Sequence, residues 1–389
     1  MAETDSQQYY KLDKILEQDA IYNIIVGERS NGKTYACLMY ALEQWFKERK
    51  QFALIRRYAE AFKAGKGQAY FESIIFNGEL RRLSEAYSTE HTYVGIRYKQ
   101  YQYFMVYEDI VYDKKGNPSR KLFQEQEPIG YAYYLTNMEN DKGTTHPAIS
   151  TIIFDEFMTR NRYLPNEFVI FANMVSTIVR RRSDAKIFLC GNSVSFYCPY
   201  FEEMGLKHVK SQEQGTIAIY RHKANKIAVE YTASTSESKE SDVYFAFDNP
   251  KLEMITSGAW ELDVYPHLTS KIRPSDIVLS TVIRFNDDLL GFDVVKSEFG
   301  TPYGYIYWRS PNLSLSSQLL FSNVISDNDI TNPLVVNNLV NACHLNGCYR
   351  NVSIVAKLLY DLWINKRVFV SNNECGEVFR CYLDWCKIN

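Results

Sequence analysis

Apolar residues in the first sixty positions form two short runs on either side of an amphipathic stretch. Residues 21–26 are largely apolar and end at Gly27, and residues 51–58 form the second run. Between them, residues 34–50 repeat apolar side chains at helical spacing, and a short helix is expected over 7–19. A strand, a helix and a strand in this order predict the beginning of a parallel α/β sheet.

Further apolar runs continue this pattern to about residue 210. Residues 149–157 and 186–193 predict two more buried strands, and residues 166–182 predict a helix that begins near Asn166. Residues 91–112 alternate instead and lead into a turn sequence at 113–118, which predicts an antiparallel insertion. We therefore expect an N-terminal α/β domain over 1–210 with a mostly parallel sheet.

The next segment is predicted to be a linker. A hairpin is expected over 216–232 with its turn at 224–225, and residues 233–242 are polar and low in aromatic side chains. The segment 211–255 is therefore interpreted as a helical or hairpin linker between two domains.

The last third of the chain has a different order of elements. Residues 278–309 predict three antiparallel strands, and residues 367–370 predict a further strand among helices. The helical patterns lie at 332–343, 352–364 and 377–386. These elements predict a C-terminal α+β domain over 256–389.

Composition limits the class of protein. The chain has 389 residues, of which 46% are apolar and 23% charged, as in an ordinary soluble globular protein. Its net charge of −2 means that any contact with nucleic acid must come from local placement of Lys and Arg. The N-terminus lacks a secretory pattern, and no apolar run approaches the ~20 residues that span a bilayer. We therefore expect an intracellular protein without a membrane partner.

The eight cysteines have two possible uses. Two clusters, Cys343 with Cys348 and Cys375 with Cys381 and Cys386, raise the question of a zinc site. Their gaps are not the short C-x2-C spacing of structural zinc sites. Free thiols packed as small apolar side chains are the favoured interpretation.

Residues 27–34 carry the strongest chemical signal. They have the form G-x-x-x-x-G-K-[ST] between a strand and a helix, as a phosphate-binding loop requires. Lys33 would reach the β- and γ-phosphates, and the Thr34 hydroxyl would bind Mg²⁺. The predicted cofactors are therefore ATP and Mg²⁺. The expected binding residues of the loop are Gly27, Glu28, Arg29, Ser30, Asn31, Gly32, Lys33 and Thr34.

An acid pair ends the predicted strand at 149–157. Asp155 at the carboxyl end of that strand can bind Mg²⁺, and Glu156 can act as the general base for the attacking water. No N-K-x-D guanine-reading motif is present. The pair favours an ATPase with an additional strand and a catalytic glutamate over a small GTPase or a simple kinase.

Three arginines, at 180–182, end the predicted helix that follows. They can complement the helix dipole as a cationic C-terminal cap. Alternatively, one of them can reach the γ-phosphate of a neighbouring subunit as an arginine finger. Position along the chain leaves these two interpretations open.

Four stretches together resemble one family, the DNA-packaging (genome encapsidation) ATPases of small short-tailed phages of the φ29 type. The stretches lie between about residues 21 and 201 and read FALIRRY, DKGTTHPAISTIIFDEF, YLPNEFVIFANMVSTIVRRR and KIFLCGNSVSFYCPYF. The resemblance implies that Lys33 and Thr34 bind phosphate and Mg²⁺, that Asp155 is the Walker B acid and that Glu156 is the catalytic base.

The resemblance also implies roles for residues outside these motifs. Arg180 falls at the family's finger supplied in trans, and Asn192 falls where these motors sense the γ-phosphate. Lys142 matches a family lysine that contacts nucleotide or DNA, and Arg29 is a loop arginine found in viral packaging motors. Arg160 and Arg162 are candidates for contact with DNA.

As a member of such a family, the chain would form a ring, commonly a pentamer, docked on the portal of a procapsid with double-stranded DNA in its pore. A structural packaging RNA would link motor and portal. The place of action would be the host cytoplasm, transiently at the portal vertex. The C-terminal domain would be RNase H-like.

Nuclease activity is not expected of that domain. A nuclease of this type needs an aspartate on its first strand, and residues 277–285 contain none. Asp287, Asp288 and Asp293 lie in the turn and second strand, so a vestigial nuclease used for docking is predicted. The alternatives are a terminase that also cleaves DNA and a non-motor ATP-binding assembly protein.

Overall fold

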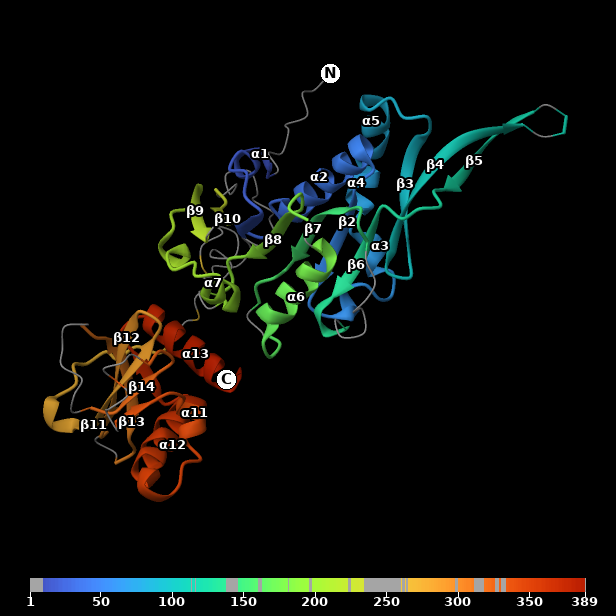
Figure 1. Ribbon diagram of the computed structural model, residues 1–389. Coiled ribbons are helices and arrows are strands. Elements are labelled where there is room, and N and C mark those ends of the chain that lie inside the picture. The colour runs from blue at the N-terminus through green and yellow to red at the C-terminus, as the bar shows by residue number, and fades with distance from the viewer. Residues whose placement is uncertain are drawn as a thin grey trace. The chain divides into compact units, whose positions relative to one another are not determined.

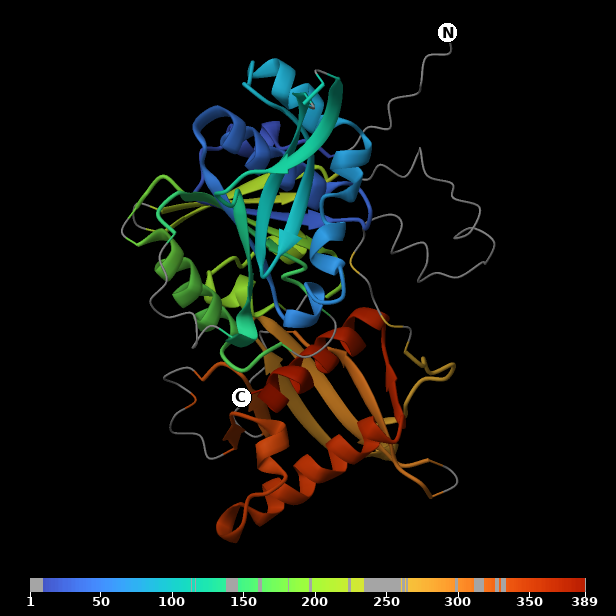
Figure 2. The same cartoon turned by 90° about the vertical axis from the view of Figure 1, so that its right-hand side faces the viewer.

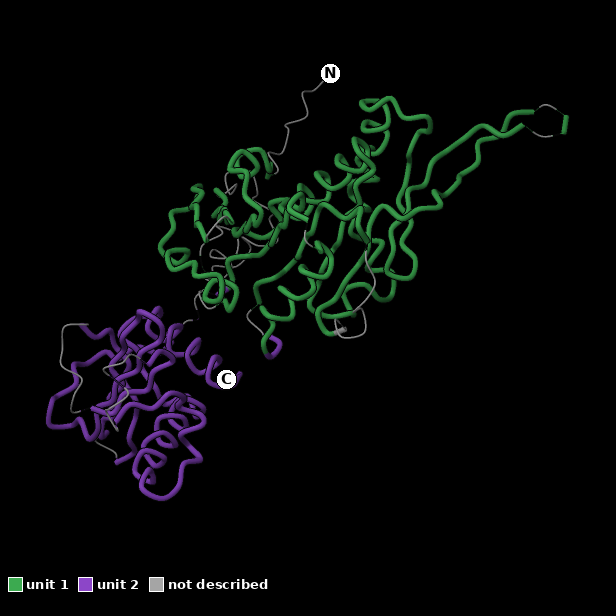
Figure 3. The backbone as a smooth tube through the Cα atoms, in the orientation of Figure 1, with its two compact units in different colours: residues 1–160, 166–194, 198–260 green, residues 161–165, 195–197, 261–389 purple. Residues whose placement is uncertain are grey.

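The computed structural model describes residues 10–112, 114–115, 117–137, 146–159, 163–180, 182–195, 198–222, 225–233, 260, 263, 265–297, 300–310, 318–325, 329 and 334–388. The chain divides into two compact units (Figure 3). The first comprises residues 1–160, 166–194 and 198–260, and the second comprises residues 161–165, 195–197 and 261–389. Each unit is built around its own sheet.

Parallel strands form the centre of the first sheet (Figure 1). Their spatial order is β6 (Gly130–Tyr134), β2 (Gln51–Arg56), β7 (Ile149–Asp155), β8 (Lys186–Asn192), β1 (Tyr22–Gly27) and β10 (Asn225–Tyr231). Each of these strands runs parallel to its neighbour, so their carboxyl ends meet at one edge. The central strands β7, β8 and β1 therefore end side by side, where ligands of open α/β sheets bind.

Helix α2 (Lys33–Glu48) follows β1 through the glycine-rich loop. Its buried side chains recur at helical spacing and pack into the core of the first unit. The helix ends at Arg49, which adopts a left-handed φ of 55°. The predicted strand, loop, helix and strand are thus confirmed, with boundaries shifted by one or two residues. The helix α1 (Asp13–Leu16) is shorter than the expected 7–19, of which 7–9 lie outside the described residues.

Short helices connect β2 to the antiparallel insertion. They are η1 (Ala59–Ala61), α3 (Lys66–Ala69), α4 (Glu72–Phe76) and α5 (Glu79–Ala86). The predicted insertion is confirmed as β3 (Thr92–Lys99), β4 (Gln102–Tyr112) and β5 (Pro118–Gln124), paired antiparallel. Beyond the body of this sheet, β4 and β5 continue as a two-stranded ribbon (Figure 1).

Helix α6 (Glu167–Val179) separates β7 from β8, and α7 (Pro199–Glu203) follows β8. The predicted helix over 166–182 therefore ends three residues early. Arg180 adopts φ 39°, which is incompatible with a further helical turn. Two 3₁₀ turns, η2 (Leu135–Asn137) and η3 (Val209–Ser211), complete the helical elements here.

The predicted hairpin over 216–232 is present, but it lies in the first sheet. Strand β9 (Thr216–His222) pairs antiparallel with β10, and β10 pairs parallel with β1. Residues 225–231 are mostly buried because they cover the open edge of β1. The linker predicted from residue 211 is thus wrong at its start. The polar stretch 233–242 falls almost entirely outside the described residues.

The second unit contains the three predicted antiparallel strands, β11 (Ile277–Phe285), β12 (Asp288–Val295) and β13 (Tyr303–Trp308) (Figure 2). The short 3₁₀ turn η5 (Pro274–Asp276) precedes them. The order of strands in this sheet is β15 (Val335–Val336), β14 (Leu320–Ser322), β11, β12, β13 and β16 (Val368–Val370). Strand β16 confirms the strand expected at 367–370.

Among the described residues of the second unit, the helices are α11 (Leu339–Ala342), α12 (Arg350–Ile364) and α13 (Asn373–Ile388), with the 3₁₀ turn η6 (Gly347–Tyr349). The helix predicted over 332–343 is wrong in its first half. Val335 and Val336 extend the sheet as β15, since β-branched residues fit a strand edge. Asn338 then caps α11 by accepting a hydrogen bond from the Asn341 N–H.

Neither a membrane span nor a metal cluster is found in the described part of the chain. No helix there is long and apolar enough to cross a bilayer. Nor do three or more His, Cys, Asp or Glu side chains gather there in position to hold a metal ion. All eight cysteines are free thiols, and only Cys348 is exposed.

Candidate active site

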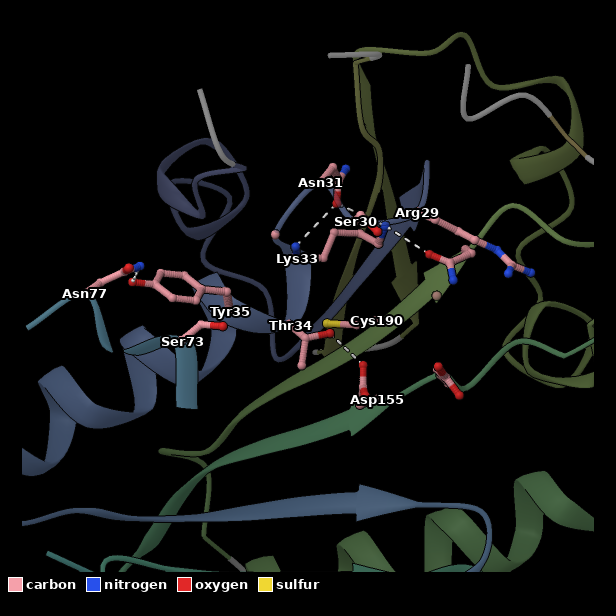
Figure 4. Close-up of a pocket in the computed structure, with 14 residues that line it drawn as sticks. Arg29, Ser30, Asn31, Lys33, Thr34, Tyr35, Ser73, Asn77, Asp155 and Cys190 are labelled. Atoms are coloured by element: carbon pink, nitrogen blue, oxygen red, sulfur yellow. Dashed lines mark hydrogen bonds between the residues drawn. The ribbon is translucent and has the colours of Figure 1, made fainter. Parts of the chain in front are cut away.

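A pocket of about 480 Å³ lies at the carboxyl ends of β1, β7 and β8. Figure 4 shows residues of the glycine-rich loop on one side and Asp155 on the other. The lining residues are Arg29, Ser30, Asn31, Gly32, Lys33, Thr34, Tyr35, Ser73, Asn77, Asp155, Glu156, Cys190, Gly191 and Asn192. The loop and the acid pair, 120 residues apart in sequence, therefore share one pocket.

The backbone of the loop needs glycine at two positions. Gly32 adopts φ 90° immediately before α2, in a region that L side chains rarely adopt. Gly27 lies against β10, and a Cβ there would come within 1.9 Å of Thr232 Oγ1. The Asn31 side-chain amide also donates to Thr232 Oγ1, at 3.0 Å. Thr232, directly after β10, therefore packs against the loop at Gly27 and Asn31.

Lys33 is buried at the start of α2. Its ammonium donates to Glu28 O at 2.5 Å, to Asn31 Oδ1 at 3.1 Å and to Asn192 Oδ1 at 3.3 Å. Burial lowers the pKa of Lys33 to about 8, because the charged form loses solvation. A phosphate oxygen would restore the stabilisation of that charge.

Thr34 and Asp155 join α2 to β7. The Thr34 hydroxyl donates to Asp155 Oδ1 at 2.6 Å. A hydroxyl and a carboxylate oxygen this close form an oxygen donor set of the kind that Mg²⁺ prefers. The residues present therefore fit the predicted magnesium ion.

Arg56 is a residue of this site that the motif search missed. Its guanidinium lies 2.5 Å from Asp155 Oδ2, contacts the Glu156 carboxylate and donates to Tyr70 Oη at 2.8 Å. Arg56 ends β2, the strand next to β7. Its signal in the sequence is an arginine at the end of an apolar run, and only the strand order places that run beside the acid-bearing strand.

Glu156 follows β7 with a left-handed φ of 55°. Its side chain is 60% exposed, whereas Asp155 is buried. The left-handed turn directs the chain away from the strand just after Asp155. Glu156 is therefore accessible to a water molecule in the pocket.

Asn192 lies where the sequence placed it, at the end of β8 and beside Gly27 in the register of β1. Its Oδ1 accepts from Lys33 Nζ. Gly27 and Glu28 form the back of the loop, and the Glu28 side chain is buried. The remaining loop residues predicted to bind nucleotide line the pocket.

Arg180 is not among the residues that line the pocket of its own chain. It is exposed at the C-terminal end of α6. The Arg182 side chain donates to Val179 O at the end of α6, at 3.2 Å, and to Ile149 O of β7, at 2.5 Å. Lys142, Arg160 and Arg162 lie outside the described residues.

Tyr35, Ser73 and Asn77 were also missed by sequence reasoning. They line one end of the pocket, where Asn77 Nδ2 lies 3.4 Å from Tyr35 Oη. Ser73 and Asn77 come from α4 and the residue that follows it, in the connection between β2 and β3. No local motif marks them, because only the fold of this connection brings them to the loop.

The family of the chain follows from its sequence. Residues 4–83 and 99–240, more than half of the chain, match the model of the Podovirus DNA encapsidation protein (Gp16). The chain belongs to this encapsidation protein family. The matched range includes the glycine-rich loop, the acid pair, Arg180 and Asn192. The resemblance inferred from the four sequence stretches is therefore confirmed.

Curated relatives align with part of this Gp16 family member. The DNA packaging protein of Bacillus phage phi29 is 28% identical over 200 residues, which are 51% of this chain and 50% of the relative. The DNA packaging protein of Bacillus phage B103 is 29% identical over 195 residues, 49% of this chain and 50% of the relative. The chain thus spans about half the length of the curated relatives it matches.

Two solved structures share the fold of this Gp16 family member. The Phi-28 gp11 DNA packaging motor superposes with a TM-score of 0.52 at 16% identity, covering 99% of each chain. A chain of the bacteriophage Phi-29 viral genome packaging motor assembly superposes with a TM-score of 0.52 at 21% identity, covering 96% of this chain and 99% of its own. At these identities the similarity establishes the fold, which confirms the predicted α/β class.

Proposed function

We propose that this chain is an ATPase that drives double-stranded DNA into a preformed procapsid. The observation that carries the proposal is the convergence of Lys33, Thr34, Asp155 and Glu156 on one pocket in a member of the encapsidation family. The loop supplies phosphate recognition, and the acid pair supplies hydrolysis. Membership of the DNA encapsidation family indicates that hydrolysis is coupled to DNA packaging.

The geometry supports hydrolysis in the following way. Backbone N–H groups of the loop and the N-terminal end of α2 hold the phosphates, and the Lys33 ammonium moves from the Glu28 and Asn31 oxygens to phosphate oxygens. Mg²⁺, when bound, would neutralise charge that develops on the phosphates, held by Thr34 and Asp155. Glu156 orients a water molecule and accepts its proton at a carboxylate oxygen.

Arg56 has to release Glu156 before that proton transfer. Its guanidinium contacts both Asp155 and Glu156. Binding of nucleotide adds negative charge, which competes with the two acids for Arg56 and with the Glu28 and Asn31 oxygens for Lys33.

We place Arg180 at the pocket of a neighbouring subunit as an arginine finger in trans. Two observations support this. Arg180 is exposed at the end of α6, and its own chain's pocket is lined without it. Arg180 caps the helix through its backbone N–H, which donates to Ser176 O, and its side chain is exposed. A finger in trans makes hydrolysis depend on a ring, for which we propose a pentamer.

Asn192 and Arg29 are proposed to transmit the state of the nucleotide. Asn192 contacts Lys33 from β8, so a γ-phosphate that attracts Lys33 also changes the end of that strand. Arg29 lines the pocket, and we propose that it moves between nucleotide and acid pair. Lys142 is proposed to contact nucleotide or DNA on the basis of the resemblance.

The partners are proposed from the family and from the solved phi29-type assembly. They are double-stranded DNA, the portal of the procapsid and a structural packaging RNA. The site of action is the host cytoplasm, transiently at the portal vertex.

The second unit is proposed to be an RNase H-like docking domain, within the predicted limits 256–389. Its first five strands lie in the order β13-β12-β11-β14-β15, with the first three antiparallel. The first strand, β11, carries no aspartate, and Asp293 lies on β12. Nuclease activity is therefore not part of the proposal.

DNA protection is the experiment that tests the proposed function. The chain, cognate procapsids, DNA and ATP are incubated, and DNA resistant to added nuclease is measured. The parent chain is expected to protect DNA, and Lys33→Ala and Glu156→Gln are expected to lose protection. Protection by both variants at the parent level would overturn the proposal.

Two outcomes would favour other functions. Cleavage of plasmid DNA with Mn²⁺ that is abolished by Asp287→Ala would indicate a terminase that also cuts DNA. Stoichiometric ATP binding without release of phosphate in the presence of DNA and procapsids would indicate a non-motor assembly protein.

A further inference from the structure

Arg57, the residue after Arg56, points into the protein and away from the pocket. Its side chain is 8% exposed, and it forms a two-pronged ion pair with Glu167, Nε to Oε2 at 2.7 Å and Nη2 to Oε1 at 2.9 Å. The Glu167 side chain is completely buried. Two buried charges this close, joined by two parallel hydrogen bonds, fix both side chains in one geometry.

The same guanidinium also holds the backbone beyond the acid pair. Arg57 Nη2 donates to Phe157 O at 2.7 Å, and Nη1 donates to Glu156 O at 3.3 Å. The Phe157 N–H is held on its other side by Cys190 O of β8, at 3.2 Å. The backbone turn at Glu156 is therefore held by Arg57 and by β8 together.

A third side chain completes this arrangement. The Tyr200 hydroxyl donates to Glu167 Oε1 at 3.0 Å, and its ring packs against Phe157 with centroids 5.6 Å apart. Tyr200 is fully buried. Arg57, Glu167 and Tyr200 thus form one buried group, called here the Arg57 network, around the carbonyl oxygens of Glu156 and Phe157.

We propose that Arg57 is a positioning residue that acts through Glu156. The left-handed φ of Glu156 is an unfavourable backbone conformation for a residue other than glycine, so surrounding contacts must impose it. The Arg57 network supplies those contacts and aims the Glu156 carboxylate at the pocket. This inference rests on the proposed function, because it takes Glu156 as the general base.

The network reaches one further element. Glu167 is the first residue of α6, and Arg180 caps the other end of the same helix. The contact that orients the acid pair in one subunit therefore also fixes the helix whose far end carries the proposed finger. A change at Glu156 and a displacement of α6 are coupled through Arg57.

A double-mutant cycle on the full chain tests the positioning role. Arg57→Lys keeps the charge but loses the fork that contacts two carbonyl oxygens and a carboxylate. In the parent background we expect kcat for ATP hydrolysis to fall about 10- to 100-fold, as for a misplaced catalytic group, with KM changed less than about threefold. In the Glu156→Gln background, Arg57→Lys should change residual kcat by less than about threefold.

Equal losses of kcat in both backgrounds would overturn the inference, because Arg57 would then act independently of Glu156. A lower melting temperature with unchanged kcat would also overturn it and leave Arg57 a purely structural role. Arg49→Lys is the control for lost stability in the same unit, since Arg49 packs over Trp45 and bonds Tyr93 away from the site. It should leave kcat unchanged.

Tyr200→Phe provides the test if Arg57→Lys does not fold. It removes one hydrogen bond to Glu167 and should lower kcat by about two- to fivefold, again only when Glu156 is present. No dependence on Glu156 would count against the network. Glu156→Gln alone separates the two hypotheses, since full activity of that variant would refute the proposed function, not just the role of Arg57.

Discussion

The Arg56 guanidinium lies 2.5 Å from Asp155 Oδ2, at the adjacent carboxyl ends of β2 and β7. The same guanidinium also contacts the Glu156 carboxylate. One arginine thus pairs with both acids. The acid that would bind metal and the acid that would activate water therefore share a positive partner.

Removal of Arg56 is expected to strengthen binding of a divalent cation in the absence of nucleotide. Arg56→Ala leaves two neighbouring carboxylates without their positive partner, so Mn²⁺ should bind roughly tenfold more tightly. Electron paramagnetic resonance of free Mn²⁺ measures this affinity. Arg81→Ala, which breaks the Glu108 ion pair elsewhere, is the control and should show no change. Unchanged affinity of Arg56→Ala would show that Arg56 does not compete with the metal.

Binding of ATP is expected to weaken above pH 8. The pKa of Lys33 is lowered to about 8 by burial in the free site, and bound phosphates raise it again. The complex therefore retains a proton that the free protein loses, so Kd should rise by up to about tenfold per pH unit above pH 8. Titration with a fluorescent ATP analogue between pH 7 and 9.5 checks this. Lys33→Arg, which stays charged, should have a flat profile over the same range.

Hydrolysis is expected to require Mg²⁺ and the Thr34 hydroxyl. Thr34→Val keeps the shape of the side chain but removes the oxygen that lies 2.6 Å from Asp155 Oδ1. The Mg²⁺ concentration for half-maximal hydrolysis should rise by at least about tenfold, and chelation should abolish hydrolysis in the parent. Phosphate release measured against free Mg²⁺ tests both. The same Mg²⁺ dependence in parent and variant would exclude Thr34 as a ligand.

Mixing two inactive variants is expected to restore hydrolysis. Glu156→Gln lacks the proposed base but retains the proposed finger, whereas Arg180→Ala retains the proposed base but lacks the proposed finger. Interfaces that combine an intact Glu156 with a neighbour's Arg180 should therefore hydrolyse ATP in mixed rings. Phosphate release is measured across mixing ratios. Absence of recovery at every ratio would contradict the role of Arg180.

Arg182→Ala is the matched control in the same arginine triplet. Its hydrogen bonds to Val179 O and Ile149 O stay within one chain, so the variant should lose about 1–2 kcal/mol of stability. It should recover no activity on mixing with Glu156→Gln beyond the activity that it has alone. Thermal unfolding and the same mixing assay measure both properties. If Arg182→Ala recovered activity on mixing as Arg180→Ala is expected to, Arg180 would not be the arginine that specifically acts as the finger.

Local sequence was sufficient to predict the elements that carry the motif residues. Gly27 to Thr34 specify a strand, a tight loop and a helix start within eight positions, because glycine permits the φ of 90° at Gly32 and Lys33 begins α2. Asp155 and Glu156 follow an apolar run that can only be a buried strand. In both cases the information lies in contiguous residues, and the structure places these side chains in one pocket.

The tertiary structure decided which residues surround those motifs. Arg56 is 99 residues from Asp155 along the chain, and only the pairing of β2 with β7 brings the two together. Strand β10 was predicted as a linker element, since nothing in its sequence shows that β1 has an open edge for it to cover. Periodicity reports which face of an element is buried, whereas strand order depends on contacts between distant segments. The sequence by itself therefore determined the glycine-rich loop and the acid pair, and the order β2-β7-β8-β1-β10 determined how they are held.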